Sequence, residues 1–422
     1  MRQRGRGAIR VVRNGPATGY AAGNCQSTRR PNGVPRADTV TIAGTCNGPA
    51  LARLRSVVAW AALLRMAAET HVVGRKVMAR FRTFLQSAFV LALAVAVVYV
   101  VAADVSSEQL PPGHETLSIT TAQGDRECVI YAPRAYDKTS PIPVVIMLHG
   151  MGGTAINALR ETGWSAKADD EAFIAVYPEA TRPAMDRPPS FSRNPQAWND
   201  GSGRFHAADK QIDDVAFIRA VIDRITAEYA VDDHRIFVTG FSNGASMAFR
   251  VAAELSDRIA AVAPNAGACW TESPHPTRMI SICYITGAAD TLNPLEGGFP
   301  RLAFGGKQQG GRPKPAVQAV IDKWAKALEC PPEPSRDETI KGVRTRVYGP
   351  GRDSAEVAFV TVEGLGHHWA GGEAQAPEFL VGRRTDKLKA TDVVWDFFQS
   401  HPVRKASIAE TKAAPGDGSH SR

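Results

Sequence analysis

The chain has 422 residues, of which 44% are hydrophobic, so it is long enough to bury a large core and its composition excludes a disordered polypeptide. Its formal net charge of +8 is uneven, because residues 1–82 contain 15 Lys and Arg but only two acidic residues. Residues 104–422 therefore carry a net charge of −5. A nucleic-acid-binding domain needs its positive charge on the folded body, so we expect no nucleic-acid partner.

The first part of the chain resembles an extension followed by an export signal. Residues 1–77 are rich in Arg, Gly and Ala, and we predict an unstructured basic extension there. Residues 78–103 combine basic residues, an uncharged apolar run over 88–103 and small residues at the end, which are the features of a secretory signal cleaved after Ala103. An uncleaved membrane anchor is the alternative, although the run is short for a bilayer span of about 20 residues. We hypothesise that translation begins at Met78. Either version predicts a body outside the cytoplasm, secreted, periplasmic or anchored.

The body, residues 112–404, alternates short apolar runs with helical periodicity, and a flexible polar tail is predicted over 405–422. Strands are predicted near 127–132, 143–148, 172–177, 235–239, 259–264, 279–286 and 356–362. Helices are predicted over 213–229, 243–256, 315–328 and 391–400, with Asp213 or Asp214 capping the first. Continuous Val- and Ile-rich runs indicate strands buried on both faces. The alternation therefore predicts an α/β fold, a mostly parallel doubly wound sheet with helices on both faces.

The most informative motif is Gly240-Phe241-Ser242-Asn243-Gly244, which lies between a predicted strand and a predicted helix. A G-x-S-x-G sequence at such a turn is the nucleophile elbow of the α/β-hydrolase fold, where the Ser Oγ projects above the sheet. The alternative is an ordinary glycine-rich turn. The context of strand and helix favours Ser242 as a nucleophile.

A serine nucleophile needs a base and an acid, which follow it in the order Ser, Asp or Glu, His in this fold. Asp290 follows the predicted strand 279–286 and is a candidate acid, with a turn cap as the alternative role. His367 and His368 both follow the strand 356–362. His149 precedes Ser242 and is therefore in the wrong chain position to be the base.

An oxyanion hole needs two backbone N–H groups. The first is expected from Asn243, the residue after the nucleophile. The second is expected from Met151, because Leu148-His149-Gly150-Met151-Gly152-Gly153 is close to the HGGG type of lipase and esterase loop.

Cysteines in the body have no metal-ligand spacing, and no metal or cofactor is implied. In an exported domain they form one or two disulfides or remain as buried thiols, and both alternatives are open. The four residues are Cys128, Cys269, Cys283 and Cys330.

Four segments together resemble the polyhydroxybutyrate depolymerase and feruloyl esterase group of exported α/β-hydrolases, over roughly residues 112–402. They are LHGMGG, YAVDDHRIFVTGFSNGASMA, GAADTLNPLEGG and GLGHHWAGG. The resemblance implies Ser242 as nucleophile, Asp290 as acid and His367 as base, since the G-H-x-W pattern places His368 on the variable position. Ala370 replaces the proline usual in this group.

The resemblance implies a serine esterase that acts through an acyl-enzyme on short-chain polyester, meaning 3-hydroxybutyrate oligomers or polymer. A feruloyl or acetylxylan esterase is the alternative substrate class. A serine peptidase or amidase and a non-catalytic binding module are the alternatives in other classes. Trp198, Trp270 and Trp369 are candidate substrate-binding residues, with core packing as the alternative. The glycine-rich segment 296–312 is either a mobile flap or a surface loop, and no oligomeric state is predicted.

Overall fold

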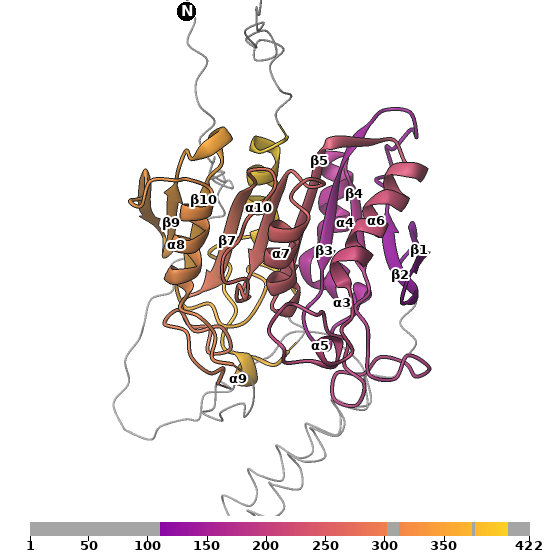
Figure 1. Ribbon diagram of the computed structural model, residues 1–422, viewed down its shortest axis with the longest axis horizontal. Coiled ribbons are helices and arrows are strands. Elements are labelled where there is room, and N and C mark those ends of the chain that lie inside the picture. Colours follow the sequence, from indigo (N-terminus) through magenta and orange to yellow (C-terminus); the bar gives the residue numbers. More distant parts are fainter. Residues whose placement is uncertain (1–109, 302–311, 374–375, 404–422) are drawn as a thin grey trace, which may run out of the picture. The chain divides into compact units, whose positions relative to one another are not determined.

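The computed structural model describes residues 110–301, 312–373 and 376–403 (Figure 1). The extension over 1–77, the signal or anchor over 78–103 and the tail over 405–422 lie outside these ranges and stay predictions. Within the described ranges, no helix is long and apolar enough to cross a membrane.

The described residues form a ten-stranded mixed sheet in the order β1-β2-β4-β3-β5-β6-β7-β10-β9-β8. The central strands run parallel: β4 (Ile174–Pro178), β3 (Ile142–Leu148), β5 (Val231–Phe241), β6 (Ala261–Asn265), β7 (Ser281–Gly287) and β10 (Val357–Val362). Antiparallel strands flank this centre: β1 (His114–Thr121) and β2 (Gly124–Tyr131) on one side, β9 (Val343–Tyr348) and β8 (Arg336–Ile340) on the other.

All seven predicted strands are present within a few residues of their expected bounds, and the predicted α/β class is confirmed. Sequence analysis missed β1, β8 and β9. These strands read HETLSITT, RDETI and VRTRVY, so they carry many polar residues and expose much of their length. An outer strand with one solvated face lacks the continuous apolar run by which the central strands were recognised.

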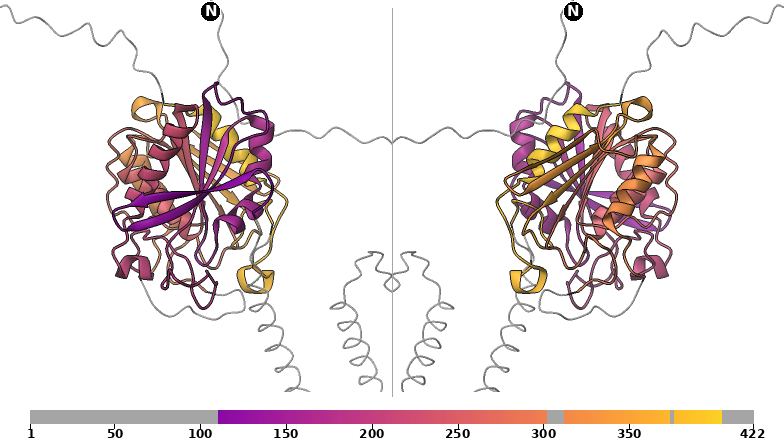
Figure 2. Two further views of the ribbon diagram at one scale, coloured as in Figure 1. Left: turned by 90° about the vertical axis from the view of Figure 1, so that its right-hand side faces the viewer. Right: turned by 90° about the vertical axis from the view of Figure 1, so that its left-hand side faces the viewer.

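Helices cover both faces of the sheet (Figure 2). One hydrophobic core receives side chains from α6 (Asp214–Glu228), α7 (Asn243–Glu254) and α8 (Val317–Ala327). A second core receives side chains from α3 (Ala155–Thr162), α4 (Trp164–Glu171) and α10 (Ala390–Ser400). The short α3, α4, α5 (His206–Asp209) and α9 (Glu378–Val381) were not predicted, since none of them is longer than eight residues.

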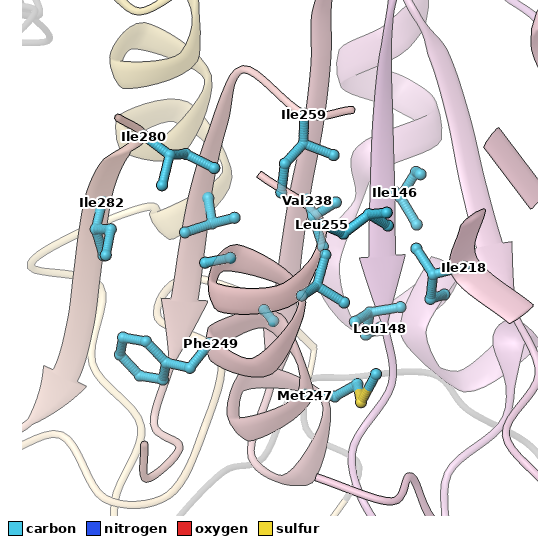
Figure 3. Packing of buried hydrophobic residues seen from close by; sticks show 14 of the residues in the cluster. Ile146, Leu148, Ile218, Val238, Met247, Phe249, Leu255, Ile259, Ile280 and Ile282 are labelled. Atoms are coloured by element: carbon cyan, nitrogen blue, oxygen red, sulfur yellow. The ribbon is translucent and has the colours of Figure 1, made fainter. Parts of the chain in front are cut away.

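Side chains of the central strands alternate between the two cores. Ile146 and Leu148 of β3 belong to the same core as Met247 of α7 (Figure 3). Val145 and Met147, the intervening residues of β3, belong to the other core. Burial on both faces therefore explains the uninterrupted apolar sequence of this strand.

Asp213 and Asp214 at the start of α6 have different roles. The Asp213 side chain accepts the N–H of Ala216 at 2.9 Å, so Asp213 is the N-cap. Asp214 is fully buried and pairs with Arg126, whose Nη1 lies 2.7 Å from Asp214 Oδ1. The pair links α6 to β2, and Asp214 Oδ2 also accepts the N–H of Asn199 at 2.7 Å.

Replacing Asp214 would leave the Arg126 guanidinium buried without its carboxylate. We expect Asp214→Ala to lower the free energy of unfolding by about 3–5 kcal/mol, the cost of breaking a buried ion pair from one side. Urea titration followed by circular dichroism measures this change. Asp257→Ala is the matched control, because the Asp257–Arg219 pair is largely exposed and contributes less than about 1 kcal/mol. Equal losses in the two variants would contradict this expectation.

Candidate active site

The turn between β5 and α7 presents Ser242 at the carboxyl edge of the sheet. Ser242 has φ 55° and ψ −114°, a strained conformation for a residue with a side chain. A Cβ on Gly244 would overlap the carbonyl oxygen of Leu148, and a Cβ on Gly240 would overlap that of Gly244. The close packing of α7 against β3 therefore requires glycine at position 244, and the close approach of the end of β5 to the first turn of α7 requires glycine at position 240.

The structure brings Ser242, His367 and Asp290 together in one hydrogen-bonded chain. His367 Nε2 lies 2.8 Å from Ser242 Oγ, and His367 Nδ1 lies 2.7 Å from Asp290 Oδ2. The three residues follow β5, β10 and β7, whose carboxyl ends meet at the same edge of the sheet. A proton on Nδ1, donated to the carboxylate, leaves Nε2 free to accept the serine proton.

His368 does not reach the serine. Its Nε2 lies 2.9 Å from the carbonyl oxygen of Gly382, and the residue is 3% exposed. The main chain of the histidine loop is fixed from the same segment, since the N–H groups of Gly366 and His367 donate to Arg383 and Val381, each at 2.7 Å. The His367 imidazole is therefore presented to Ser242 by a braced loop.

Asp290 is held in its ionised form. Its Oδ1 accepts the backbone N–H groups of Leu292 at 2.9 Å and Asn293 at 2.8 Å. Burial opposes ionisation of this carboxyl, but the hydrogen bond and charge of His367, the charge of Lys314 and the backbone N–H of Asn293 outweigh it, so the pKa of Asp290 lies below its usual value. An ionised Asp290 can stabilise the imidazolium that forms when His367 takes a proton.

Met151 and Asn243 lie on the two segments that flank Ser242. A Cβ on Gly150 would lie 3.4 Å from the Ser242 Cβ, so the loop carrying Met151 passes directly beside the serine. In the described part of the chain neither the Met151 N–H nor the Asn243 N–H donates to another protein group. Both N–H groups are therefore available to bind an oxyanion.

His149 fixes the orientation of this loop. Its Nε2 accepts the backbone N–H of Ala180 at 3.1 Å, so the proton is on Nδ1, which donates to the carbonyl oxygen of Gly150 at 2.8 Å. Burial lowers the pKa of His149 to about 4, so the ring is neutral and its 3.7 Å approach to Glu179 is not an ion pair. Because the peptide is planar and trans, holding the Gly150 carbonyl also fixes the opposite direction of the Met151 N–H.

Gln196 holds the other end of the loop, and sequence analysis did not identify it. Its backbone carbonyl oxygen accepts the N–H of Gly152 at 2.7 Å. Its side-chain Nε2 donates to the backbone carbonyl oxygen of Gly153 at 3.2 Å and to the Glu179 carboxylate. Glu179 in turn accepts the N–H of Ala155, the first residue of α3, at 3.0 Å. No motif marks Gln196 in the sequence, because its partners are distant in the chain.

Trp198 and Trp369 are buried inside the protein, which favours the core alternative for both. Trp198 Nε1 donates to the carbonyl oxygen of His149 at 2.9 Å, so this residue braces the loop after β3. Trp369 Nε1 donates to Thr391 Oγ1 at 3.0 Å. Trp270 is 7% exposed, and its indole N–H has no partner in the described part of the chain.

Cysteines in the body are free thiols, so the structure shows the second of the two open alternatives. Burial raises the pKa of Cys128 and Cys283 to about 12 and that of Cys330 to about 11, which keeps them protonated. Among the described residues, no group of three or more His, Cys, Asp and Glu side chains is placed to hold a metal ion.

Comparison with known proteins identifies the family. A model described as Phospholipase/Carboxylesterase matches residues 135–298. NocK of Nocardia uniformis subsp. tsuyamanensis, an inferred esterase, is 30% identical over 271 residues, which cover 60% of this chain and 73% of NocK. The chain belongs to the phospholipase/carboxylesterase family. This family member is therefore a carboxylesterase-type hydrolase with the α/β-hydrolase fold.

More distant relatives of this carboxylesterase include the two groups named by the sequence motifs, so that resemblance is confirmed. Feruloyl esterase B of Piromyces equi is 28% identical over 57% of this chain and 42% of the relative. Poly(3-hydroxyalkanoate) depolymerase C of Paucimonas lemoignei is 24% identical over 53% of this chain and 54% of the relative. The chain thus spans about half of these two proteins or less. The structure of an acetyl xylan esterase from Aspergillus awamori aligns with a TM-score of 0.42 and 16% identity, over 60% of this chain and 94% of the other.

Glu161 is a buried carboxyl beneath the histidine loop. Glu161 is 7% exposed, and its backbone carbonyl oxygen accepts the N–H of Glu373 at 3.0 Å. Burial raises the pKa of Glu161 to about 8, against a smaller opposing effect of a hydrogen bond from the Trp369 backbone. The carboxyl is therefore protonated in the folded carboxylesterase at neutral pH.

This raised pKa predicts a pH-dependent loss of stability. The unfolded chain ionises Glu161 near 4.5 and the folded chain only near 8, so the stability contribution present below pH 4.5 is lost as the pH rises to about 8. Glu161→Gln is expected to remove this loss. The free energy of unfolding of the variant, relative to that of the wild type, should therefore rise between pH 4.5 and 8 by at most about 1.4 kcal/mol per pH unit and stay constant above pH 8. Urea unfolding at a series of pH values tests this, with Glu363→Gln at an exposed site as control. An advantage that does not change with pH would contradict the buried-carboxyl account.

Removing the Gln196 side chain should loosen the Met151 loop. We expect Gln196→Ala to lower kcat for p-nitrophenyl acetate by about 10–100-fold with little change in KM, because a displaced oxyanion donor weakens binding of the transition state more than of the substrate. Steady-state kinetics separate the two constants. Ser192→Ala, on the same loop but exposed, is expected to behave as wild type. A rise in KM at unchanged kcat would argue against this role for Gln196.

Proposed function

We propose that this carboxylesterase hydrolyses esters through an acyl-enzyme on Ser242. The observation that carries the proposal is the continuous hydrogen-bond chain from Asp290 through His367 to Ser242 at the strained turn. His367 takes the serine proton as Oγ attacks the ester carbonyl, and Asp290 orients and stabilises the imidazolium. The N–H groups of Met151 and Asn243 bind the oxyanion.

The second half of the reaction reuses the same groups. His367 returns its proton to the departing alcohol, which leaves the acyl group on Ser242. A water molecule then gives a proton to His367 and attacks the acyl carbonyl. Collapse of the second tetrahedral intermediate breaks the bond to Ser242 Oγ, His367 returns the proton to that oxygen, and the carboxylic acid is released. His367 carries the proton in every transfer, and Asp290 stabilises the imidazolium that forms. The two N–H groups stabilise the negative charge on the oxyanion.

Short-chain polyester is the substrate class that we propose, in the form of 3-hydroxybutyrate oligomers or polymer. The four motif segments and the relationship to a poly(3-hydroxyalkanoate) depolymerase support it. Feruloyl and acetylxylan esters are the alternative, supported by the relationship to a feruloyl esterase and a bifunctional acetylxylan esterase/xylanase of Neocallimastix patriciarum. The same constellation also cleaves amides, so amide substrates belong in the test. A non-catalytic binding module is disfavoured because all three reacting groups are in contact.

Export is part of the proposal and rests on the sequence alone. The basic and apolar composition of residues 78–103 supports a secreted or periplasmic enzyme, or one anchored through 88–103 with its catalytic body outside the cytoplasm. Polymeric esters cannot cross a membrane, so a body outside the cytoplasm is consistent with such a substrate.

Three variants of the full chain test the catalytic roles. We expect Ser242→Ala and His367→Ala to lower kcat by about 10⁴–10⁶-fold, while the neighbouring His368→Ala keeps most of the activity. Initial rates are measured on p-nitrophenyl esters of rising acyl length, methyl ferulate, acetylated xylan, 3-hydroxybutyrate oligomers and a p-nitroanilide. Labelling by a fluorophosphonate should occur at Ser242.

Each outcome of this panel has a distinct meaning. Preference for hydroxybutyrate oligomers supports the polyester substrate, and preference for ferulate or xylan supports the alternative. If Ser242→Ala keeps near wild-type turnover, the proposed nucleophile is wrong. If no ester is hydrolysed in a Ser242-dependent way, the esterase proposal fails and the amide or binding alternatives remain.

A further inference from the structure

A buried lysine lies next to the acid of the proposed triad. Lys314 is 8% exposed, and its Nζ donates to Asn293 Oδ1 at 3.1 Å. The backbone N–H of Asn293 donates to Asp290 Oδ1 at 2.8 Å. Two hydrogen bonds therefore connect the ammonium group with Asp290.

An arginine lies next to the residue that follows the nucleophile. Asn243 Nδ2 donates to Asp200 Oδ2 at 2.9 Å, and Arg204 Nη2 lies 3.4 Å from the same oxygen. The Arg204 guanidinium lies 4.9 Å from the centre of the Trp270 ring, and its side chain is 17% exposed. Arg204 is therefore close to Ser242 and still partly open to solvent.

These two cations are close enough to affect each other. Burial and the charge of Arg204 lower the pKa of Lys314 to about 8, although Asp290 and Asp200 act in the opposite direction. Two partly desolvated positive charges repel, and such pairs are costly unless an anion compensates them. The nearby carboxylates are already engaged: Asp290 by His367 and the turn after it, and Asp200 by Asn243, Ser202 and Arg204.

Donor groups around these cations lack acceptors. In the described part of the chain, the buried Arg204 Nε and Trp270 Nε1 have no hydrogen-bond partner, and the Lys314 ammonium uses one of its three N–H bonds. A buried donor without an acceptor destabilises the folded state, so such groups call for a ligand or another explanation. All three side chains are donors only, and a carboxylate is an acceptor only. The chemistry of the set therefore matches a carboxylate.

We propose that Arg204, Lys314 and Trp270 form a subsite for a carboxylate of the substrate, so that the preferred esters carry a free carboxylate near the scissile bond. The free-acid end of a short hydroxyalkanoate oligomer has this chemistry, since only a few bonds separate its last ester from its carboxylate. This inference rests on the proposed ester hydrolysis at Ser242. It makes soluble, acid-terminated oligomers the substrate in preference to the interior of a solid polymer.

A matched pair of substrates tests the subsite. The 3-hydroxybutyrate dimer and the same dimer with its carboxyl as a primary amide have the same shape and one ester each, but differ in charge. We expect wild-type kcat/KM to be about 10–100-fold higher for the free acid, the effect of charge-assisted hydrogen bonds. Arg204→Gln should lose at least about tenfold more activity on the free acid than on the amide, and Lys314→Gln should do the same. Arg352→Gln, an exposed arginine paired with Glu329, should keep the wild-type ratio.

Binding to an inactive protein separates this proposal from the catalytic one. Isothermal titration calorimetry with the full-length Ser242→Ala protein should show the free acid binding more tightly than the amide, and Arg204→Gln in that background should abolish the difference. Binding of this kind without hydrolysis would overturn the catalytic proposal and keep the subsite. A wild-type preference for the amide, equal affinities, or equal losses on both dimers in Arg204→Gln would overturn the subsite.

Discussion

The close contact between the start of helix α7 and strand β3 determines the geometry of the site. Ser242 keeps a positive φ because Gly240 and Gly244 allow two backbone segments to approach nearly without side chains between them. The same contact places the loop after β3 beside the serine, so Ser242 and the Met151 N–H are positioned together. The cost of the strained residue is offset by the packing of α7 in one of the two hydrophobic cores.

Around this contact, the protein fixes main-chain groups with side chains that do not react. His149, Gln196 and Trp198 each bond to a backbone atom of residues 149–153, and Glu179 connects Gln196 to the start of α3. Because both ring nitrogens of His149 are hydrogen-bonded to backbone groups, it does not compete with His367 as a base. The two histidines therefore have separate roles, one in orienting the loop and one in contact with the serine.

The sequence predicted the central fold and singled out the three residues that the structure joins by hydrogen bonds, because their signals are local. Apolar runs marked the parallel strands, and the glycines around Ser242, Asp290 and His367 marked turns at strand ends. Gln196 and Arg204 carried no such signal, since their roles depend on contacts with residues far away in the chain. The outer strands β1, β8 and β9 were missed because exposure replaces the apolar run with a mixed sequence. Long-range contact and solvent exposure thus limited what the sequence alone could predict.

The free cysteines have a practical consequence for the described body. Its fold uses no covalent cross-link, so the free energy of folding should be the same in a reducing and in an oxidising solution. Protonated, mostly buried thiols also react slowly with oxidants and alkylating agents. Recombinant production in a reducing cytosol, refolding without a redox couple and storage in air should therefore all yield the same species.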